Sequence, residues 1–368
     1  MRFVFFWVFS MLMLGCSASR IQQPETLPAF DGFTETADGW RLSVFRVPPS
    51  GGVEQPHHGV PVLLVHGAAT NRQTFMLEGS DLSGFLAEAG FDVWIAELRG
   101  DRTSRPPDER TWKRGDWNVD RMIDRDVPAI LDHIEAATGH PSVFWVGHSL
   151  GGVLGLVTLQ TERASRIRGL IAVGSPVVFT HPSDIAARSA GLKPLAPKTG
   201  QMGVRTLASL SRGSLRLGPD APLFHLMFNA DNLDVDAATK FAMVGMENIG
   251  GGVTEQFEGW LEAGHITSAD GATDWTDGMN KVTAPVLFVA GRVDGLAPPW
   301  AVRGGYDRVS SSDSTWMTMG RGWGQRNDYG HGDLLIGDWA YEEVFPPLRD
   351  WLVSRAVGPA KEVPSGSP

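Results

Sequence analysis

Six short apolar runs recur along the chain, separated by polar or helix-like stretches. Continuous Val, Ile, Leu and Phe runs of four or five residues are typical of strands buried on both faces. Their alternation with helices indicates βα units, and therefore an α/β fold with a mostly parallel central sheet and helices on both faces. The runs are residues 61–65, 91–95, 143–146, 170–173, 286–289 and 315–318.

Two further elements can be predicted beside these strands. Residues 40–47 alternate in polarity after a turn signal at 38–39, which indicates an antiparallel hairpin at the edge of the sheet. A helix is expected to start or kink near Asp126, because Pro128 follows it, and to lead into the run at 143–146.

A long segment interrupts the alternation of strands and helices. More than one hundred residues separate the fourth run from the fifth, too many for a loop, with helical-looking pieces at 237–246 and 254–263 and a Gly250-Gly251-Gly252 break. We interpret 180–280 as a largely helical cap over the C-terminal edge of the sheet, where open α/β sheets bind ligands. The core is then 29–179 and 281–356, and the tail 357–368 is expected to be disordered.

Composition and charge exclude several classes of protein. Of the 368 residues, 42% are hydrophobic, which is ample for a large core. The formal net charge is −10 and no cluster of Lys and Arg is visible, so we expect no nucleic-acid partner. No second Cys, H-E-x-x-H pattern, P-loop or G-x-G-x-x-G after a strand is present, so we expect no metal and no cofactor.

The N-terminal segment predicts export. Residues 1–15 carry one Arg and then an apolar run that is too short for a membrane span, as in a signal peptide. Residues 13–16, Met-Leu-Gly-Cys, resemble a bacterial lipobox. That resemblance implies a lipoprotein of the cell envelope, anchored in a membrane through lipidated Cys16, with 16–28 as a tether. The alternative is an ordinary signal peptide on a secreted or periplasmic protein.

The pentapeptide at 147–151, Gly-His-Ser-Leu-Gly, fits the pattern G-x-S-x-G between an apolar strand and a helix. Its two glycines permit a tight turn that pushes the serine hydroxyl outward and leaves the next backbone N–H facing a reacting oxygen. A turn kept only for packing is the alternative. We predict that Ser149 is a nucleophile.

A serine hydroxyl needs a histidine base, which a carboxylate holds in place. In this type of fold the order along the chain is Ser, acid, His. Of the ten histidines only His331 follows the last predicted strand, in a Gly-flanked loop, so we expect it to be the base. We expect His148 to be a packing residue beside the site and His57 and His58 to be solvent-exposed.

The acid is expected just past the C-terminal end of a strand. Asp294 follows the run at 286–289 in a Gly-flanked loop and is our prediction. Asp313, Asp328 and Asp333 are its competitors.

The negative oxygen of the transition state requires hydrogen-bond donors. One should be the Leu150 N–H, directly after the nucleophile. The other should come from the loop after the first core strand, where Gly67 permits close approach and the Ala68 N–H can donate. His66 is expected to brace this loop by a side-chain hydrogen bond.

Taken together, these residues resemble the α/β-hydrolase superfamily and, more narrowly, the acid lipases, the gastric and lysosomal lipases. Glu97 and Asp101 replace the two Asn of that family's D-V-W-x-x-N-x-R-G-N pattern, and Leu150 and Gly152 replace its Gln and Thr after the nucleophile. The cap gives no match. The matching segments are 36–48, 64–67, 92–105 and 126–134.

The resemblance implies a serine carboxylester hydrolase, of the esterase and lipase class EC 3.1.1, that acts on small-molecule or lipid esters with apolar acyl chains through an acyl-enzyme. Alternatives are an acyltransferase or a thioester or polyester hydrolase on the same triad, or a lipid-anchored binding protein without catalysis. Apolar cap residues could line an acyl pocket or form the cap's own core. They are Phe224, Leu226, Met227, Phe228, Phe241, Met243, Met246, Phe257 and Trp260.

Overall fold

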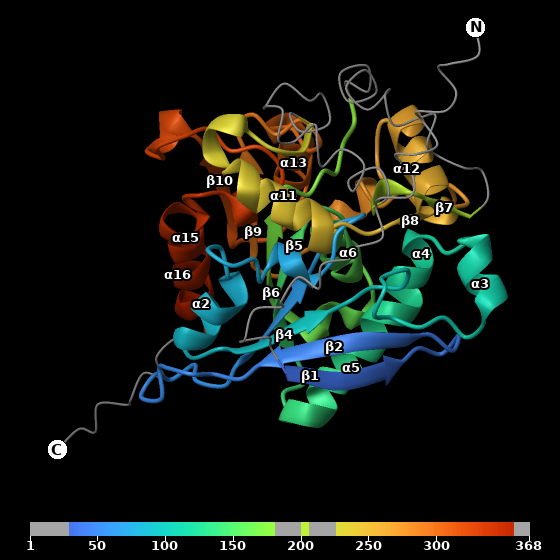
Figure 1. The fold of residues 1–368 in the computed structure, drawn as a ribbon, viewed down its shortest axis with the longest axis horizontal. Helices are drawn as coiled ribbons and strands as arrows, with labels where there is room; N and C mark the ends of the chain where they lie inside the picture. The colour runs from blue at the N-terminus through green and yellow to red at the C-terminus, as the bar shows by residue number, and fades with distance from the viewer. Residues whose placement is uncertain (1–28, 181–199, 206–225, 357–368) are drawn as a thin grey trace, which may run out of the picture.

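The computed structural model describes residues 29–180, 200–205 and 226–356, built on an eight-stranded sheet (Figure 1). The strands lie in the order β1-β2-β4-β3-β5-β6-β9-β10. Each of the six apolar runs forms one of these strands, as predicted. The bounds are β1 Ala29–Glu35, β2 Arg41–Val47, β3 Pro61–Val65, β4 Asp92–Ala96, β5 Val143–His148, β6 Ile167–Val173, β9 Val286–Gly291 and β10 Ser314–Met319.

The six inner and C-terminal strands, from β4 to β10 in the sheet order, pair in parallel. Strands β1 and β2 pair antiparallel to each other, and β2 is antiparallel to β4, so the predicted edge hairpin is confirmed. Because parallel strands point the same way, the loops that follow β3, β5, β6 and β9 all leave from one edge of the sheet.

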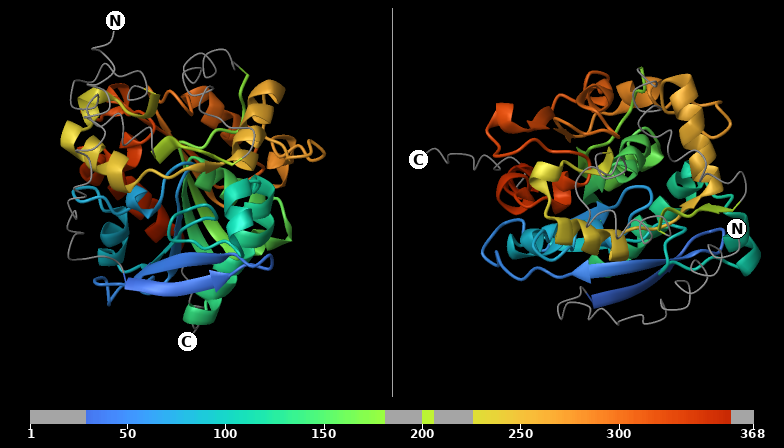
Figure 2. Two further views of the ribbon diagram at one scale, coloured as in Figure 1. Left: turned by 45° about the vertical axis from the view of Figure 1, so that its right-hand side comes forward. Right: turned by 45° about the horizontal axis from the view of Figure 1, so that its top comes forward.

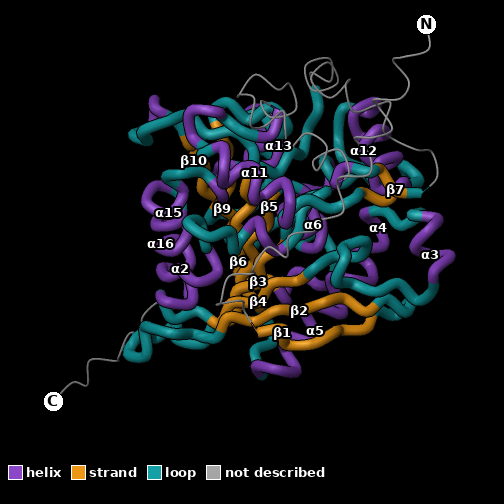
Figure 3. The backbone as a smooth tube through the Cα atoms, in the orientation of Figure 1, coloured by secondary structure: helices purple, strands orange, loops and turns teal. Residues whose placement is uncertain are grey.

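Side chains of the sheet alternate between two hydrophobic clusters, one on each face. Leu63 of β3 belongs to the cluster that contains residues of α5 and α6, whereas its neighbour Leu64 belongs to the cluster with α2 and α16. Figure 3 shows the strands in orange between these helices in purple. The predicted α/β architecture, with helices on both faces, is therefore confirmed.

The helices of this core are short apart from α5 and α16. The α-helices are α2 Leu82–Glu88, α3 Glu109–Arg114, α4 Val119–Arg121, α5 Val127–Thr138, α6 Leu150–Thr158, α13 Pro299–Tyr306, α14 Asp333–Ile336, α15 Ala340–Glu343 and α16 Phe345–Ala356. The 3₁₀ turns are η1 Arg72–Thr74, η3 Glu162–Arg166 and η7 Arg321–Trp323, and η2 Met122–Asp126 is a π-helical turn.

The helix expected near Asp126 begins with the π-helical turn η2 and continues as α5. Asp126 is buried, and its carboxylate lies 2.6 Å from the Arg99 guanidinium. Arg99 also contacts Asp38 at 2.9 Å. This ion-pair network joins the hairpin turn, the loop after β4 and the start of α5, which are three of the segments that carry the acid-lipase resemblance.

The described part of the 180–280 segment contains two helices that lie apart in both views of Figure 2. The helix α12 begins inside the glycine triplet that we expected to be a break. Its Gly252 packs so closely on the preceding loop that a Cβ atom would lie 2.6 Å from the Trp117 carbonyl oxygen. The elements are β7 Gln201–Met202, η5 Ala230–Asn232, α11 Val235–Val244, β8 Ile249–Gly250, α12 Gly251–Ala263 and η6 Asp277–Lys281.

Several predictions concern residues outside the described part of the chain. They are the signal peptide, the tether with Cys16, the tail 357–368 and the cap residue Phe224. Within the described residues, none of the helices is both long and apolar enough to cross a membrane.

Candidate active site

Ser149 occupies a strained turn between β5 and α6. Its φ of 52° and ψ of −118° lie in a region that side chains rarely adopt, at a typical cost of about 1–3 kcal/mol. Its N–H donates to the Val173 carbonyl at 2.8 Å, and its side chain is half-buried. The turn is therefore held against its own strain by the neighbouring strand β6.

The two glycines of the G-x-S-x-G pattern are required by close backbone contacts. A Cβ on Gly147 would lie 2.3 Å from the Gly152 nitrogen, and one on Gly151 would lie 2.0 Å from the Val65 carbonyl oxygen. The departure from the acid-lipase pattern at Gly152 has the same cause, since a Cβ there would lie 2.0 Å from Ser175 Oγ. These contacts press the start of α6 against β3 and β6.

His331 and Asp294 form a buried pair at the same edge of the sheet. His331 Nδ1 lies 2.8 Å from Asp294 Oδ2, so the imidazole N–H donates to the carboxylate. A Cβ placed on Gly174 would lie 3.3 Å from His331 Nδ1. Gly174 follows Val173, which binds Ser149, so the loops after β5, β9 and β10 bring the three predicted catalytic residues together near the end of β6.

The competing carboxylates are engaged elsewhere. Asp328 pairs with Arg292 and Asp313 pairs with Arg355. Asp333 accepts hydrogen bonds from the Gly330 and Asn229 N–H groups and from the Asn232 side chain. Burial raises the pKa of Asp333 to about 6, against this hydrogen bonding.

His148 lies behind the candidate base, in the packing role predicted for it. Its Nε2–H donates to the His331 carbonyl oxygen at 3.1 Å, and the two rings are 4.7 Å apart. Burial and the neighbouring His331 lower the pKa of His148 to about 3. His148 is therefore neutral near pH 7 and holds the His331 loop by a hydrogen bond.

The two predicted oxyanion donors share one small cavity. Ala68 and Leu150 both line a space of about 30 Å³, together with residues of the loops after β3 and β4. Gly67 approaches the nucleophile, since a Cβ there would lie 3.0 Å from Ser149 Cβ. Among the described residues of the 180–280 segment, this cavity is lined by Asn248, Ile249, Gly250 and Val253.

The prediction for His57 is wrong. Its side chain is buried, stacks on Phe91 at 4.8 Å and contacts the Ala89 carbonyl through Nε2 at 2.8 Å, because the chain between α2 and β4 folds over it. His58 is exposed, as expected. His57 lies before β3, at the opposite edge of the sheet from the candidate site.

A protein-family model described as "alpha/beta hydrolase fold" matches residues 60–318, more than half of the chain. The chain belongs to the α/β-hydrolase family. It is similar to human lipase member N, with 32% identity over 164 residues, which are 42% of this chain and 40% of that lipase. It is also similar to human lysosomal acid lipase/cholesteryl ester hydrolase, with 32% identity over 155 residues, 40% of this chain and 39% of that lipase.

These matches confirm the resemblance to acid lipases, although the matched part of the chain spans only about two fifths of the length of these relatives. A thermophilic esterase from Thermogutta terrifontis shares the fold, with a TM-score of 0.57 and 18% identity over 90% of this chain and 100% of the esterase.

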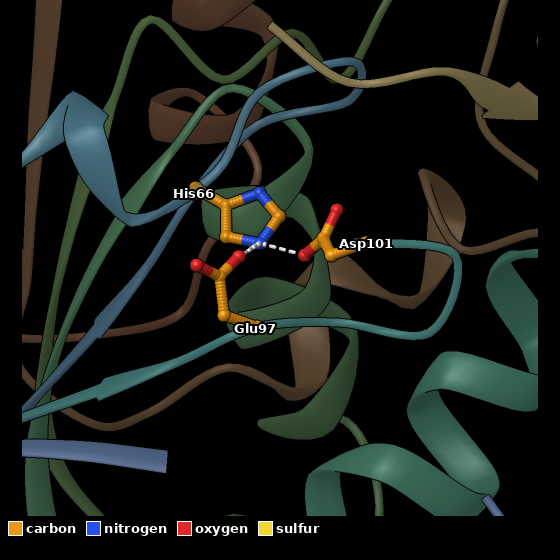
Figure 4. A group of neighbouring side chains, drawn as sticks. All are labelled: His66, Glu97 and Asp101. Carbon is orange, nitrogen blue, oxygen red and sulfur yellow. Dashed lines mark ion pairs between the residues drawn. The ribbon is translucent and has the colours of Figure 1, made fainter. Parts of the chain in front are cut away.

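Two acidic residues that depart from the acid-lipase pattern surround a buried histidine. Glu97 and Asp101 lie on either side of His66 Nε2, as Figure 4 shows. All three side chains are buried, and among the described residues they form the group whose donor atoms could hold a metal ion. Each of these three residues stands out in the sequence, but no local pattern predicts that they meet.

The 180–280 segment is hydrogen-bonded directly to the loop after β3. The Ala69 carbonyl accepts the Glu247 N–H at 2.8 Å, and Asn71 donates its side-chain amide to Glu247 and to the Val244 carbonyl, each at 2.8 Å. Ala69 adopts a φ of 58°, unusual for a residue with a side chain. The loop after β3 and the end of α11 therefore form one hydrogen-bonded unit.

Most of the apolar residues suggested for an acyl pocket pack into the hydrophobic clusters instead. Leu226, Phe228, Phe241, Met246 and Trp260 are buried. Phe228, Phe241 and Met246 join the cluster that contains α2 and α16, whereas Trp260 joins the opposite one. Met227, Met243 and Phe257 are half-buried.

Proposed function

We propose that this α/β-hydrolase is a serine carboxylester hydrolase that cleaves esters with apolar acyl chains through an acyl-enzyme. The observation that carries the proposal is the contact of 2.8 Å between His331 and Asp294. This pair lies beside Gly174, and the preceding residue, Val173, accepts the backbone N–H of the strained Ser149. The names of the similar lipases support esters of apolar acids as the substrate class.

In the proposed reaction, Ser149 Oγ attacks the ester carbonyl carbon and its proton passes to His331 Nε2. Asp294 accepts the Nδ1–H and stabilises the imidazolium. The Ala68 and Leu150 N–H groups bind the negative oxygen. His331 then gives the proton to the leaving alcohol, and a water that it deprotonates releases the acid.

A series of p-nitrophenyl esters from C2 to C16 tests this activity and its chain-length preference. We expect hydrolysis to be lost in Ser149→Ala and kept in Ser142→Ala, a control directly before β5 at the opposite end of the strand. A fluorophosphonate should label Ser149. If no ester of any length is hydrolysed and Ser149 is not labelled, the proposal fails. Transfer to an added alcohol that outcompetes water would instead support an acyltransferase.

We also propose that the protein is a bacterial envelope lipoprotein anchored through Cys16, on the lipobox-like sequence alone, since Cys16 lies outside the described residues. The expected result is a lipid-sized mass increase on Cys16 and membrane fractionation that is lost in Cys16→Ala. A soluble protein without the mass increase would contradict the anchor and leave the esterase proposal untouched.

A further inference from the structure

Two side chains hold the Gly67 carbonyl. This carbonyl belongs to the same peptide group as the Ala68 N–H, which is the proposed oxyanion donor. His66 Nδ1 lies 2.9 Å from this oxygen and Thr70 Oγ1 donates to it at 3.1 Å. The carbonyl of Gly67 and the N–H of Ala68 belong to one planar trans peptide, so they point in opposite directions. Whatever fixes the carbonyl also fixes the direction of the Ala68 N–H.

The other nitrogen of the His66 ring faces carboxylates. Asp101 Oδ2 lies 2.8 Å from Nε2 and Glu97 Oε2 lies 3.8 Å away (Figure 4). The Leu98 N–H points at the same nitrogen from 3.3 Å and donates to it when Nε2 carries a lone pair, so it competes with the shorter contact to Asp101. The second oxygen of Glu97 lies 2.6 Å from the Arg72 guanidinium.

Charge balance favours a proton on both nitrogens of His66. Two buried carboxylates face one guanidinium, so one more positive charge neutralises the group. Burial alone lowers the pKa of His66, but Asp101 and Glu97 outweigh it and raise the pKa to about 9. Burial also raises the pKa of Asp101, and Glu97 adds to this rise while His66 opposes it. Nearby His148 is neutral, as described above.

We propose that His66, which bridges the Gly67 carbonyl and the Asp101 carboxylate, is a positioning residue that holds the Gly67–Ala68 peptide in its oxyanion-binding orientation. The proposal rests on the function proposed above. A neutral imidazole can carry its proton on either nitrogen, and the form protonated only at Nε2 would turn a lone pair toward the Gly67 carbonyl. The two carboxylates favour a proton on both nitrogens, so that Nδ1 always donates to the Gly67 carbonyl. The Thr70 hydroxyl donates a second hydrogen bond to the same oxygen.

A metal ion bound by the same three side chains fits the distances less well. Two ligands at 2.0–2.2 Å from a tetrahedral zinc ion lie about 3.4 Å apart. His66 Nε2 and Asp101 Oδ2 are 2.8 Å apart, the distance of a direct charge-assisted contact.

The test compares His66→Ala with Thr70→Val and with His57→Ala in the full chain, using p-nitrophenyl butyrate. His57 is a matched control, because it is also a buried histidine in contact with a backbone carbonyl, at the opposite edge of the sheet. We expect His66→Ala to lower kcat by roughly 10- to 100-fold with KM little changed, and Thr70→Val to lower it less. We expect His57→Ala to lower the melting temperature and keep kcat.

The pH profile separates positioning from simple structural support. Wild-type kcat should persist until the pH approaches about 9, where His66 loses its proton. In Glu97→Gln/Asp101→Asn this alkaline decline should move toward neutral pH. Normal kcat in His66→Ala, equal loss in His57→Ala, or an unshifted decline in the double variant overturns the proposal while ester hydrolysis by the wild type still stands.

A measurement that requires no catalysis separates the proposed charge of His66 from the proposed esterase activity. In ¹⁵N-histidine NMR, the His66 signals, assigned with His66→Ala, should show both nitrogens protonated at pH 7.5. A neutral ring at that pH, or zinc that co-purifies and broadens or shifts Nε2, overturns the proposed charge state. Because this measurement needs no substrate, it decides the charge of His66 even if the protein hydrolyses no ester.

Discussion

His331 Nδ1 and Asp294 Oδ2 lie 2.8 Å apart although 37 positions of sequence separate the two residues. Asp294 uses its other oxygen to accept the Leu296 and Ala297 N–H groups at 2.8 and 2.7 Å. The carboxylate is therefore fixed by its own turn before it meets the imidazole, and His331 is held from behind by His148. Both partners are buried, so their contact is little screened by solvent.

Replacing Asp294 with Asn should expose the importance of this contact. The amide keeps the size of the side chain but can turn its NH₂ group toward Nδ1, which favours the wrong tautomer of His331. We expect kcat to fall by about 10⁴-fold, as measured by steady-state hydrolysis of p-nitrophenyl butyrate. Asp328→Asn, which removes an ion pair with Arg292 at a partly exposed site, should keep the activity. Comparable kcat in the two variants would show that Asp294 is not the acid.

Gly152 should not accept even a methyl group. In Gly152→Ala the new Cβ would lie 2.0 Å from Ser175 Oγ, so we expect the free energy of unfolding in urea to fall by about 1–3 kcal/mol. Adding Ser175→Gly should recover part of the loss. The control is Gly259→Ala in α12, where nothing lies within 4 Å, and it should raise the stability by roughly 0.5–1 kcal/mol. Similar effects at the two glycines would contradict the steric explanation.

Asp333 should make stability depend on pH in the acid range. Its pKa is about 6 in the folded protein, against 3.8 for an ordinary Asp, so the folded state binds the proton more tightly than the unfolded state. Its stabilising contribution is present below pH 3.8 and is lost as the pH rises through about 6. We therefore expect the difference in unfolding free energy between wild type and Asp333→Asn to decrease from pH 4 to pH 6.5. A difference that stays constant across this range would rule out the shift.

The two carboxylates on Arg99 should contribute unequally to stability. The Asp126 side chain is fully buried, whereas that of Asp38 is 27% exposed. Asp126→Asn leaves the buried guanidinium without its buried partner and should cost about 3–5 kcal/mol in chemical unfolding. Asp38→Asn should cost less, because Asp126 and solvent still compensate the charge. The reverse order would show that the hairpin contact, and not the helix contact, is the stronger one.

Much of this α/β fold could be predicted from short-range patterns. Continuous apolar runs identified the core strands, since a strand buried on both faces must be apolar throughout. The G-x-S-x-G pattern located Ser149 at a turn, because only Gly fits where backbone atoms come within 2.0–2.3 Å of a would-be Cβ. Chain order then led to Asp294 and His331, which the structure places in contact.

Other features depended on residues that approach only after folding. His57 is polar and lies in a loop, so its burial against Phe91 has no local signal. Glu97 and Asp101 stood out only as substitutions, and folding brings both to His66.

The sequence by itself determined the strands, the elbow at Ser149 and the order of the candidate catalytic residues, because these follow from the polarity and size of neighbouring residues. Only the tertiary structure decided that the buried Glu97 and Asp101 meet His66 behind the loop after β3, and that the segment after α11 is hydrogen-bonded to that loop. The physical reason is that burial and charge pairing depend on distances between segments far apart in the chain, which no local pattern contains.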